Sequence, residues 1–239
     1  MGQFHSRPGL RSSAALPAAG MDACYQRMVR SPGITDSLAR AGRNLAEFLG
    51  LLSTNGITAI GDVRSQPFSK FSPDFNEDAL KRELHKAGIA YVFLGSELGA
   101  RTSDESCYVD GKVQYDRLAT TEPFRTGLDR VERGRAGHRI ALMCAESDPL
   151  MCHRCVLVSR HLAARRIPVL HILENGLVEE HEATLRRLVH FLRIPEIYPS
   201  WTEEEMFGFA YRTRGDQIAW QKDAEDGLQF ELWGQPSAG

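Results

Sequence analysis

The sequence lacks a long uncharged apolar stretch, a strong net charge and an even set of cysteines. A membrane-spanning helix needs about 18 or more consecutive apolar residues, so we expect a soluble protein with no membrane partner. With 29 Lys and Arg against 31 Asp and Glu, the chain has no overall field that would draw it onto nucleic acid or an anionic membrane. Any anion that it binds must therefore be held by a local site.

The cysteines form an odd set, with three of them close together: Cys24, Cys107, Cys144, Cys152 and Cys155. Small secreted scaffolds usually pair an even number of cysteines in disulfides, so we expect a reducing, cytoplasmic location. The sequence also contains no P-loop, no GxGxxG motif and no phosphatase-type Cys-x5-Arg motif. These common signatures therefore assign neither a nucleotide site nor a phosphatase reaction.

The composition, with 42% hydrophobic and 25% charged residues, is that of an ordinary globular protein. The first twenty residues are rich in Ser, Ala, Arg and Pro and contain no acidic residue. We expect residues 1–22 to be a disordered extension, residues 23–222 to form a single α/β domain, and residues 223–239 to be a C-terminal tail. Aromatic residues between 198 and 220 would be costly to leave in water, which predicts that this C-terminal region packs on the domain.

Apolar patterning within residues 23–222 predicts alternating helices and strands. The predicted helices cover residues 44–52, 77–87 with Asn76 as the cap, 123–131, 152–165 and 180–192, and the predicted strands cover residues 57–63, 89–94, 139–144 and 169–173. Residues 95–121 show no clear periodicity and are expected to form a long functional loop or lid. The alternation predicts an α/β fold with a mostly parallel sheet, helices on both faces in a Rossmann-like three-layer arrangement, and a packed C-terminal helical extension.

Ligands of open α/β sheets bind beyond the carboxyl ends of the strands, and two predicted strand ends carry reactive side chains. The first holds Asp62, Arg64 and Ser65. The second, residues 144–154, joins a buried strand to a helix. A helix start offers unpaired N–H groups and a partial positive charge, which bind anions and lower the pKa of a thiol.

We therefore expect the two strand ends to converge on one positively polarised pocket. The catalytic candidates are Cys144, Glu146, Cys152 and His153, and the substrate-binding candidates are Asp62, Arg64, Ser65, Arg101, Tyr115 and Arg154. Glu146 is the candidate general acid or base, and a cysteine thiolate is the candidate nucleophile. Each residue also has an ordinary structural interpretation: Cys144 as a core residue, Arg64 as a partner of Asp62, Glu146 as a solvated loop acid.

Two sharper interpretations stay open. Residues 152–155 have the Cys-x-x-Cys form of a redox motif, although no thioredoxin-type partner residues accompany them. A zinc site is the second interpretation, with Cys144, Cys152, His153, Cys155 and His171 as candidate ligands, although their spacing matches no common structural zinc motif. We assign no metal ligand and no cofactor from the sequence.

Several of these segments resemble the bacterial and archaeal family named domain of unknown function 488. The resemblance rests on residues 61–67, 71, 75, 80, 88–91, 98–101, 141–146 and 152–154, and extends to 209–211 and 218–220. It implies a compact α/β domain with motif positions at Arg64, Cys144, Glu146, Cys152, His153 and Arg154, and it implies no settled reaction. Family members usually carry a histidine in a turn that corresponds to residues 31–37, and this chain has none there; Cys155 is not a motif position.

Three functions are compatible with these residues. The first is an enzyme that acts on a phosphate-bearing or otherwise anionic substrate, related to nucleotides or nucleic acid. The second is a non-catalytic module that binds a nucleotide or nucleic acid for regulation. The third is a thiol-redox or zinc-binding protein that uses Cys144, Cys152 and Cys155. The expected partner is an anionic small molecule or nucleotide, with nucleic acid and a second copy of the chain as further candidates.

Overall fold

The computed structural model describes residues 35–39 and 44–222. The expectations for residues 1–22, for most of the altered turn at 31–37 and for the tail 223–239 lie outside the described residues. No helix within the described ranges is both long enough and apolar enough to cross a membrane.

The centre of the fold is a six-stranded sheet with the order β3-β2-β6-β1-β7-β8. The first five strands in this order are parallel, and β8 runs antiparallel to β7 at the edge. Its strands are β1 (Thr35–Ala39), β2 (Ala59–Asp62), β3 (Ala90–Phe93), β6 (Ile140–Cys144), β7 (Val169–Ile172) and β8 (Val178–Glu180). Because β2 and β6 are neighbouring parallel strands, their carboxyl ends lie at the same edge of the sheet.

Helices connect the strands, as the sequence predicts. They are α2 (Leu45–Thr54), α3 (Glu77–Lys86), α4 (Gly95–Leu98), α5 (Tyr115–Leu118), α6 (Glu122–Gly134), α7 (Arg160–Ala164), α8 (His181–Phe191), α9 (Ile194–Ile197) and α10 (Glu203–Ile218). Side-chain caps fix several helix starts: Asn44 and Glu47 form a reciprocal capping box at α2, and Thr202 and Glu205 form another at α10.

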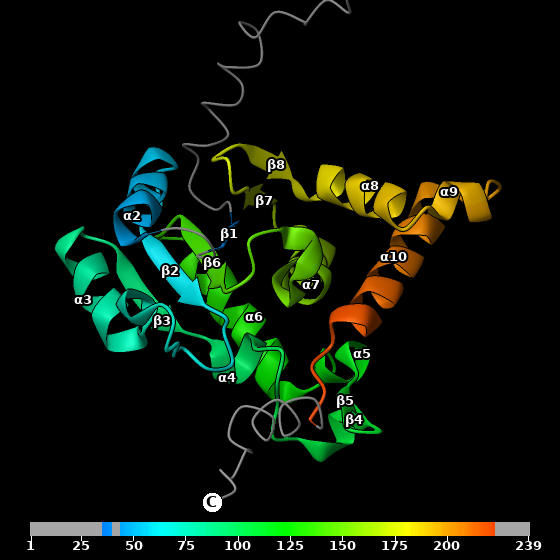
Figure 1. The fold of residues 1–239 in the computed structure, drawn as a ribbon, viewed down its shortest axis with the longest axis horizontal. Coiled ribbons are helices and arrows are strands. Elements are labelled where there is room, and N and C mark those ends of the chain that lie inside the picture. The colour runs from blue at the N-terminus through cyan, green and yellow to red at the C-terminus, as the bar shows by residue number, and fades with distance from the viewer. Residues whose placement is uncertain (1–34, 40–43, 223–239) are drawn as a thin grey trace, which may run out of the picture. The chain divides into compact units, whose positions relative to one another are not determined.

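Side chains of β6 alternate between two hydrophobic cores. Ala141 and Met143 join the core formed with α2 and α3, whereas Ile140, Leu142 and Cys144 join the larger core formed with α6, α8 and the segment before α7. Figure 1 shows α2 and α3 on one side of the sheet and α7 on the other. The chain is thus a mixed α/β structure, and Cys144 lies on the face covered by residues 152–159.

The C-terminal helical region packs on the larger core, as the sequence predicts. Tyr198 stacks on Trp201 with ring centroids 3.9 Å apart, and both contact Phe209. Trp220 meets Tyr108 edge to face at 6.0 Å. These contacts remove aromatic surface from water, which is the reason the segment does not extend away from the domain.

Two local predictions were wrong, and a third was confirmed only in part. Residues 95–121 are not one loop: they contain α4, the 3₁₀ helix η2 (Glu105–Cys107), a hairpin of β4 (Tyr108–Val109) with β5 (Lys112–Val113), and α5. Asn76 is the N-cap residue of α3, as predicted, but its side-chain oxygen accepts from the backbone N–H of Ser69 and makes no capping bond.

The segment 152–165 is also not one regular helix. It is preceded by the 3₁₀ helix η3 (Pro149–Met151), and it consists of the π-helix η4 (Arg154–Ser159) followed by α7. A π-helical turn is rare and often accompanies a functional site. Its wider winding places Cys155, Val156 and Leu157 on the buried side of the chain.

Candidate functional site

The two predicted strand ends meet. The His153 ring lies with Nε2 3.2 Å from the Val63 carbonyl oxygen, so the start of η4 touches the residue that precedes Arg64. The backbone N–H of Val63 in turn donates to the Met143 carbonyl at 3.0 Å. Parallel pairing of β2 with β6 therefore brings together segments about eighty positions apart in the sequence.

Two cysteines, a glutamate and a histidine form a compact cluster at this edge. Oε2 of Glu146 lies 2.9 Å from Sγ of Cys144 and 3.0 Å from Sγ of Cys152. Nδ1 of His153 lies 3.7 Å and 3.9 Å from the same two sulfur atoms. Both thiols and the imidazole are buried, whereas Glu146 is exposed. The cluster therefore reaches solvent on the side of the carboxyl group.

The local fold explains why Cys152 sits here. Asp148 caps the start of η3 by accepting the Leu150 N–H, and the short helix ends at Cys152, whose N–H donates to the Pro149 carbonyl. Cys152 is extended, with φ −132° and ψ 138°, and its carbonyl accepts from Cys155 N at 3.1 Å as the next helix begins. The Arg154 backbone N–H points at the Cys152 sulfur, 3.4 Å away. A thiolate at this position would receive one of the free N–H groups of the helix start.

The surroundings favour the charged form of Cys152. Burial alone raises the pKa of its thiol, but a hydrogen bond from Cys144, the charge of Arg154 and the adjacent His153 together hold that pKa well below its usual range. For His153, burial lowers the pKa, and its contact with the negatively charged Cys152 outweighs this and raises the pKa. The two shifts describe a thiolate and an imidazolium that stabilise each other.

The pKa values of Cys144 and Glu146 are shifted in the opposite direction from that of Cys152. The hydrogen bond to Cys152 and burial both raise the pKa of Cys144 well above its usual range. Burial and the negative charge of Cys152 raise the pKa of Glu146. One proton between Glu146 and Cys152 can thus reside on the carboxyl group, which then donates to the thiolate. This pairs a nucleophile with an acid that is accessible to solvent.

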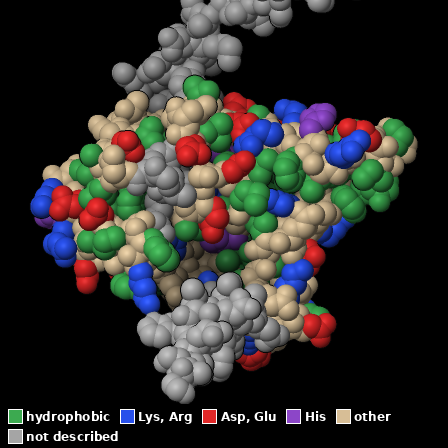
Figure 2. Space-filling model, in the orientation of Figure 1, with side chains coloured by type: hydrophobic (Ala, Val, Ile, Leu, Met, Phe, Trp, Pro, Cys, Tyr) green, Lys and Arg blue, Asp and Glu red, His purple; other side chains and the backbone are tan. Residues whose placement is uncertain are grey.

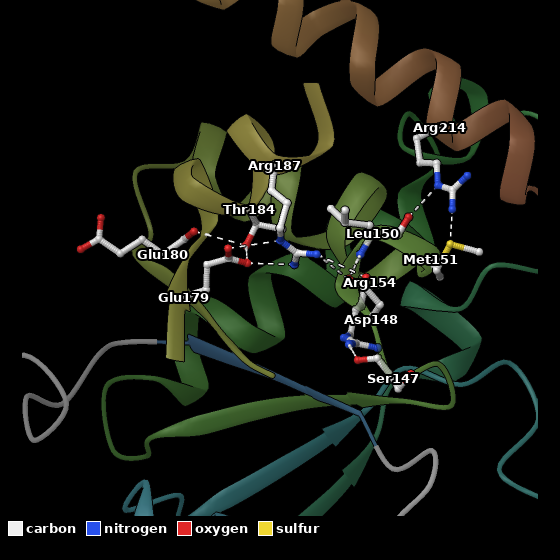
Figure 3. A network of polar contacts seen from close by, with 10 residues as sticks. All are labelled: Ser147, Asp148, Leu150, Met151, Arg154, Glu179, Glu180, Thr184, Arg187 and Arg214. Atoms are coloured by element: carbon white, nitrogen blue, oxygen red, sulfur yellow. Dashed lines mark hydrogen bonds and ion pairs between the residues drawn. The ribbon is translucent and has the colours of Figure 1, made fainter. Parts of the chain in front are cut away.

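Three arginines from three elements hold the loop that carries Glu146 (Figure 3). Arg154 donates to the carbonyl oxygens of Glu146 at 2.7 Å and Ser147 at 3.2 Å. Arg187 of α8 pairs with Asp148 at 3.2 Å, and Arg214 of α10 donates to the Leu150 carbonyl at 2.7 Å. The loop is positioned by side chains far from it in sequence.

Arg154, a predicted substrate-binding residue, is fully buried, and its guanidinium donates to these two carbonyls. A buried guanidinium needs such acceptors. Arg154 thus holds the loop in place and also contributes positive charge beside Cys152.

Arg64 is buried and held by Asp62. Its Nε and Nη2 donate to the Asp62 carboxylate at 2.9 Å and 2.6 Å, and Nη2 also donates to the Phe75 carbonyl at 2.9 Å. Tyr91 donates its hydroxyl to the same carboxylate at 2.9 Å. Nη1 of Arg64 is buried without a hydrogen-bond partner among the described residues. Of the predicted anion-binding groups, this one keeps a free donor.

The remaining candidates surround the cluster at different distances. Ser65 accepts the Arg101 backbone N–H at 3.0 Å, and the Arg101 guanidinium lies over the Trp220 ring, 4.9 Å from its centroid. Arg101 is thereby turned toward the C-terminal aromatics. Tyr115 is buried, and burial together with the charges of Cys152 and Cys144 raises the pKa of its hydroxyl, which places it beside the thiols.

The five residues considered for zinc fall into two groups. Ligand atoms of Cys144, Glu146, Cys152 and His153 lie within 4.8 Å of one another, and those of Cys155, His171 and His181 form a second group of the same tightness. Cys155 is thus associated with the histidines, and no cysteine disulfide is formed among the described residues. Sequence reasoning missed His181, because only the antiparallel turn from β7 through β8 brings it back onto His171.

On the described surface in view, acidic and basic side chains are interspersed (Figure 2). This agrees with the near-neutral composition and leaves the local groups as the source of any anion recognition.

A search of curated proteins found no match, and a search of solved structures found none either. A family model, described as domain of unknown function DUF488, matches residues 44–161. The matched segment spans β2, β6, Cys152, His153 and the π-helix η4 (Arg154–Ser159). The residues that form the thiol cluster therefore all lie within the match. Over residues 44–161, this chain belongs to the DUF488 family.

Proposed function

We propose that the chain is a thiol-dependent enzyme that acts on an anionic, phosphate-bearing substrate of the nucleotide class. The observation that carries this proposal is the setting of Cys152, whose sulfur lies 3.4 Å from a helix-start N–H and 3.0 Å from the Glu146 carboxyl group. A low-pKa thiol beside a proton donor suits nucleophilic catalysis. The parallel sheet with a core on each face supports a Rossmann-like scaffold, in which a site beyond the strand ends is expected.

Arg64 supplies the argument for an anionic substrate. Leaving a buried guanidinium donor unpaired is unfavourable, and an incoming oxyanion would satisfy Nη1 without disturbing the bonds to Asp62. The Val63 carbonyl, next to Arg64 in the chain, contacts His153, and the His153 ring lies 3.9 Å from the Cys152 sulfur. An anion bound at Nη1 would therefore lie near the nucleophile.

The chemical roles follow from the proton positions. The Cys152 thiolate forms a bond to the electrophilic centre of the substrate, and the bond from that centre to the leaving group breaks. The leaving group takes the proton of the Glu146 carboxyl group, so charge and protons balance. Water then attacks the covalent intermediate, giving its proton to the Glu146 carboxylate as the Cys152 thiolate departs. His153 stabilises the thiolate throughout.

The pH dependence of alkylation tests the nucleophile. Iodoacetamide should modify Cys152 at a rate that stays high well below neutral pH, measured peptide by peptide with mass spectrometry. Cys107 is the matched control, because burial raises the pKa of its thiol. The His153→Ala variant should shift the Cys152 profile toward alkaline pH. A Cys152 profile identical to that of Cys107 would contradict the proposal.

Thermal stabilisation by inorganic phosphate tests the anion site. The Asp62→Asn/Arg64→Gln variant removes the charges as a pair and avoids leaving either charge buried alone. Phosphate should raise the melting temperature of the wild-type protein and not that of the variant. Equal stabilisation of both proteins would remove Arg64 from the site. Stabilisation of the wild type without any thiolate signature at Cys152 would favour the non-catalytic binding module.

A second candidate is a metal site in the same cluster. Tetrahedral zinc has Zn–S distances of about 2.3 Å and Zn–N distances of about 2.0 Å, which separate neighbouring ligand atoms by about 3.3–3.8 Å. The distances of 3.7 Å and 3.9 Å between the His153 nitrogen and the two sulfurs are of this size. Metal analysis of the purified protein and of the Cys144→Ser/Cys152→Ser variant distinguishes a metal site from a free thiolate. Bound zinc that disappears in the variant would replace the free thiolate with a metal-bound one.

A further inference from the structure

Cys155, His171 and His181 form a second buried group, which shares no residue with the cluster around Cys152. Cys155 lies on η4, His171 on the buried strand β7, and His181 at the first position of α8. One ligand atom of each lies within 4.8 Å of those of the other two. The His171 Nε2 and His181 Nδ1 atoms are 2.9 Å apart, and the ring centroids are 5.1 Å apart. All three side chains are buried.

The hydrogen bonding of this group is incomplete. Of the facing nitrogens His171 Nε2 and His181 Nδ1, only one can carry the proton of their hydrogen bond. The other nitrogen of His181, Nε2, is hydrogen-bonded to the Tyr211 hydroxyl at 2.8 Å. His171 Nδ1 is buried with no hydrogen-bond partner among the described residues. A buried polar atom without a partner is unusual in a native core. An apolar core position would not require a histidine here.

Each imidazole can offer one ring nitrogen to a metal ion. His181 already has the outer partner that metal-bound histidines usually have, because its second nitrogen contacts the Tyr211 oxygen.

We propose that Cys155, His171 and His181 form a binding site for one d¹⁰ metal ion, Zn²⁺ or Cu⁺, independent of the cluster around Cys152. A thiolate and two imidazoles are a ligand set that both ions accept. The Cys155 thiol loses its proton on binding, because the thiolate is the ligand.

The charges around the site bear on which ion it holds. Arg154 and Arg187 act on His171 and oppose added positive charge. Glu179 and Asp148 pair with Arg187 and offset part of its charge. One thiolate neutralises Cu⁺ completely and leaves one positive charge with Zn²⁺. The charge balance therefore favours Cu⁺, whereas Zn²⁺ needs a further anionic ligand.

A variant with Cys155 as its sole cysteine isolates the site. In the Cys24→Ser/Cys107→Ser/Cys144→Ser/Cys152→Ser protein, Co²⁺ should produce a thiolate-to-metal absorption band. After addition of Zn²⁺, or of Cu⁺ without oxygen, followed by desalting, about one metal ion per chain should remain. Adding His181→Gln should abolish both signals. An absent band together with no retained metal would overturn the proposal.

The wild-type protein provides a second measurement that does not depend on the folding of the multiple variant. Its metal content should fall by about one ion per chain in His181→Gln and stay unchanged in Arg186→Gln, a matched change on the exposed side of α8. Metal that is lost in Cys152→Ser and retained in His181→Gln would assign all binding to the first cluster and refute the second site.

Discussion

The buried ion pair at the end of β2 gives a prediction whose size follows from the structure. Asp62 is fully buried, Arg64 is 5% exposed, and their charged atoms are 2.6 Å apart. At an effective dielectric constant of about 20, unit charges at that distance attract by about 6 kcal/mol. Much of this attraction offsets the cost of removing both charges from water.

Arg64→Met should therefore lower the stability of the protein far more than replacement of both Asp62 and Arg64. The single variant leaves the Asp62 carboxylate buried with only the Tyr91 hydroxyl and a backbone N–H, and should lower the free energy of unfolding by about 3–5 kcal/mol. The Asp62→Asn/Arg64→Met double variant should lose roughly half of that or less. Urea unfolding followed by circular dichroism measures both.

A loss below about 1 kcal/mol in Arg64→Met would refute this reasoning, because it would mean that the guanidinium is not confined by Asp62. The assignment of Nη1 as the free anion-binding donor depends on that confinement. The same unfolding curves therefore test the stability argument and the orientation on which the proposed anion site depends.

Other consequences can be measured separately. Gly95→Ala should destabilise the protein by about 3 kcal/mol, because the added Cβ would overlap with the Arg64 carbonyl oxygen; an unchanged melting temperature would show that this contact can relax. Arg214→Met leaves the Leu150 carbonyl without its donor and should lower the free energy of unfolding by about 1–3 kcal/mol. It should also slow alkylation of Cys152, and an alkylation rate equal to that of the wild type would show that Arg214 does not position the loop. His181 binds a proton less readily in the folded protein, where its pKa is about 4, than in the unfolded chain, where its pKa is about 6.5. In metal-free protein, stability should therefore fall by about 3 kcal/mol as pH drops from 6.5 to 4, and melting temperatures of His181→Gln should lack this component.

Local signals predicted the elements that local physics controls. Apolar residues at helical spacing from Leu45 to Leu52 predict a helix, and the β-branched, apolar run at residues 57–63 predicts a buried strand. The density of cysteine, histidine and arginine after β6 also indicated the segment in which the structure gathers Cys144, Glu146, Cys152 and His153. Residues 95–121 were predicted wrongly because the short helices and the two-residue strands found there leave no periodic pattern.

The grouping of side chains could not be read in the same way. Cys152 and Cys155 are only three positions apart in the sequence, but Cys152 groups with Glu146, whereas Cys155, on the π-helix, groups with His171. Arg154 and Arg64 both follow strand ends, but only Arg64 retains a free donor, because Arg154 meets the carbonyls of its own loop. Such outcomes depend on where each group finds a partner once water is excluded.

The sequence by itself determined the α/β alternation, the mostly parallel sheet and the segment that is dense in cysteine, histidine and arginine, because these follow from apolar periodicity and chain order. The pairing of β2 with β6 was decided by the tertiary structure. Only the tertiary structure decided which thiol is the charged one and which histidine faces which cysteine. Those properties depend on burial and on contacts of a few ångströms between residues distant in the chain, and electrostatic interactions of that kind are set by position in space and not by position in sequence.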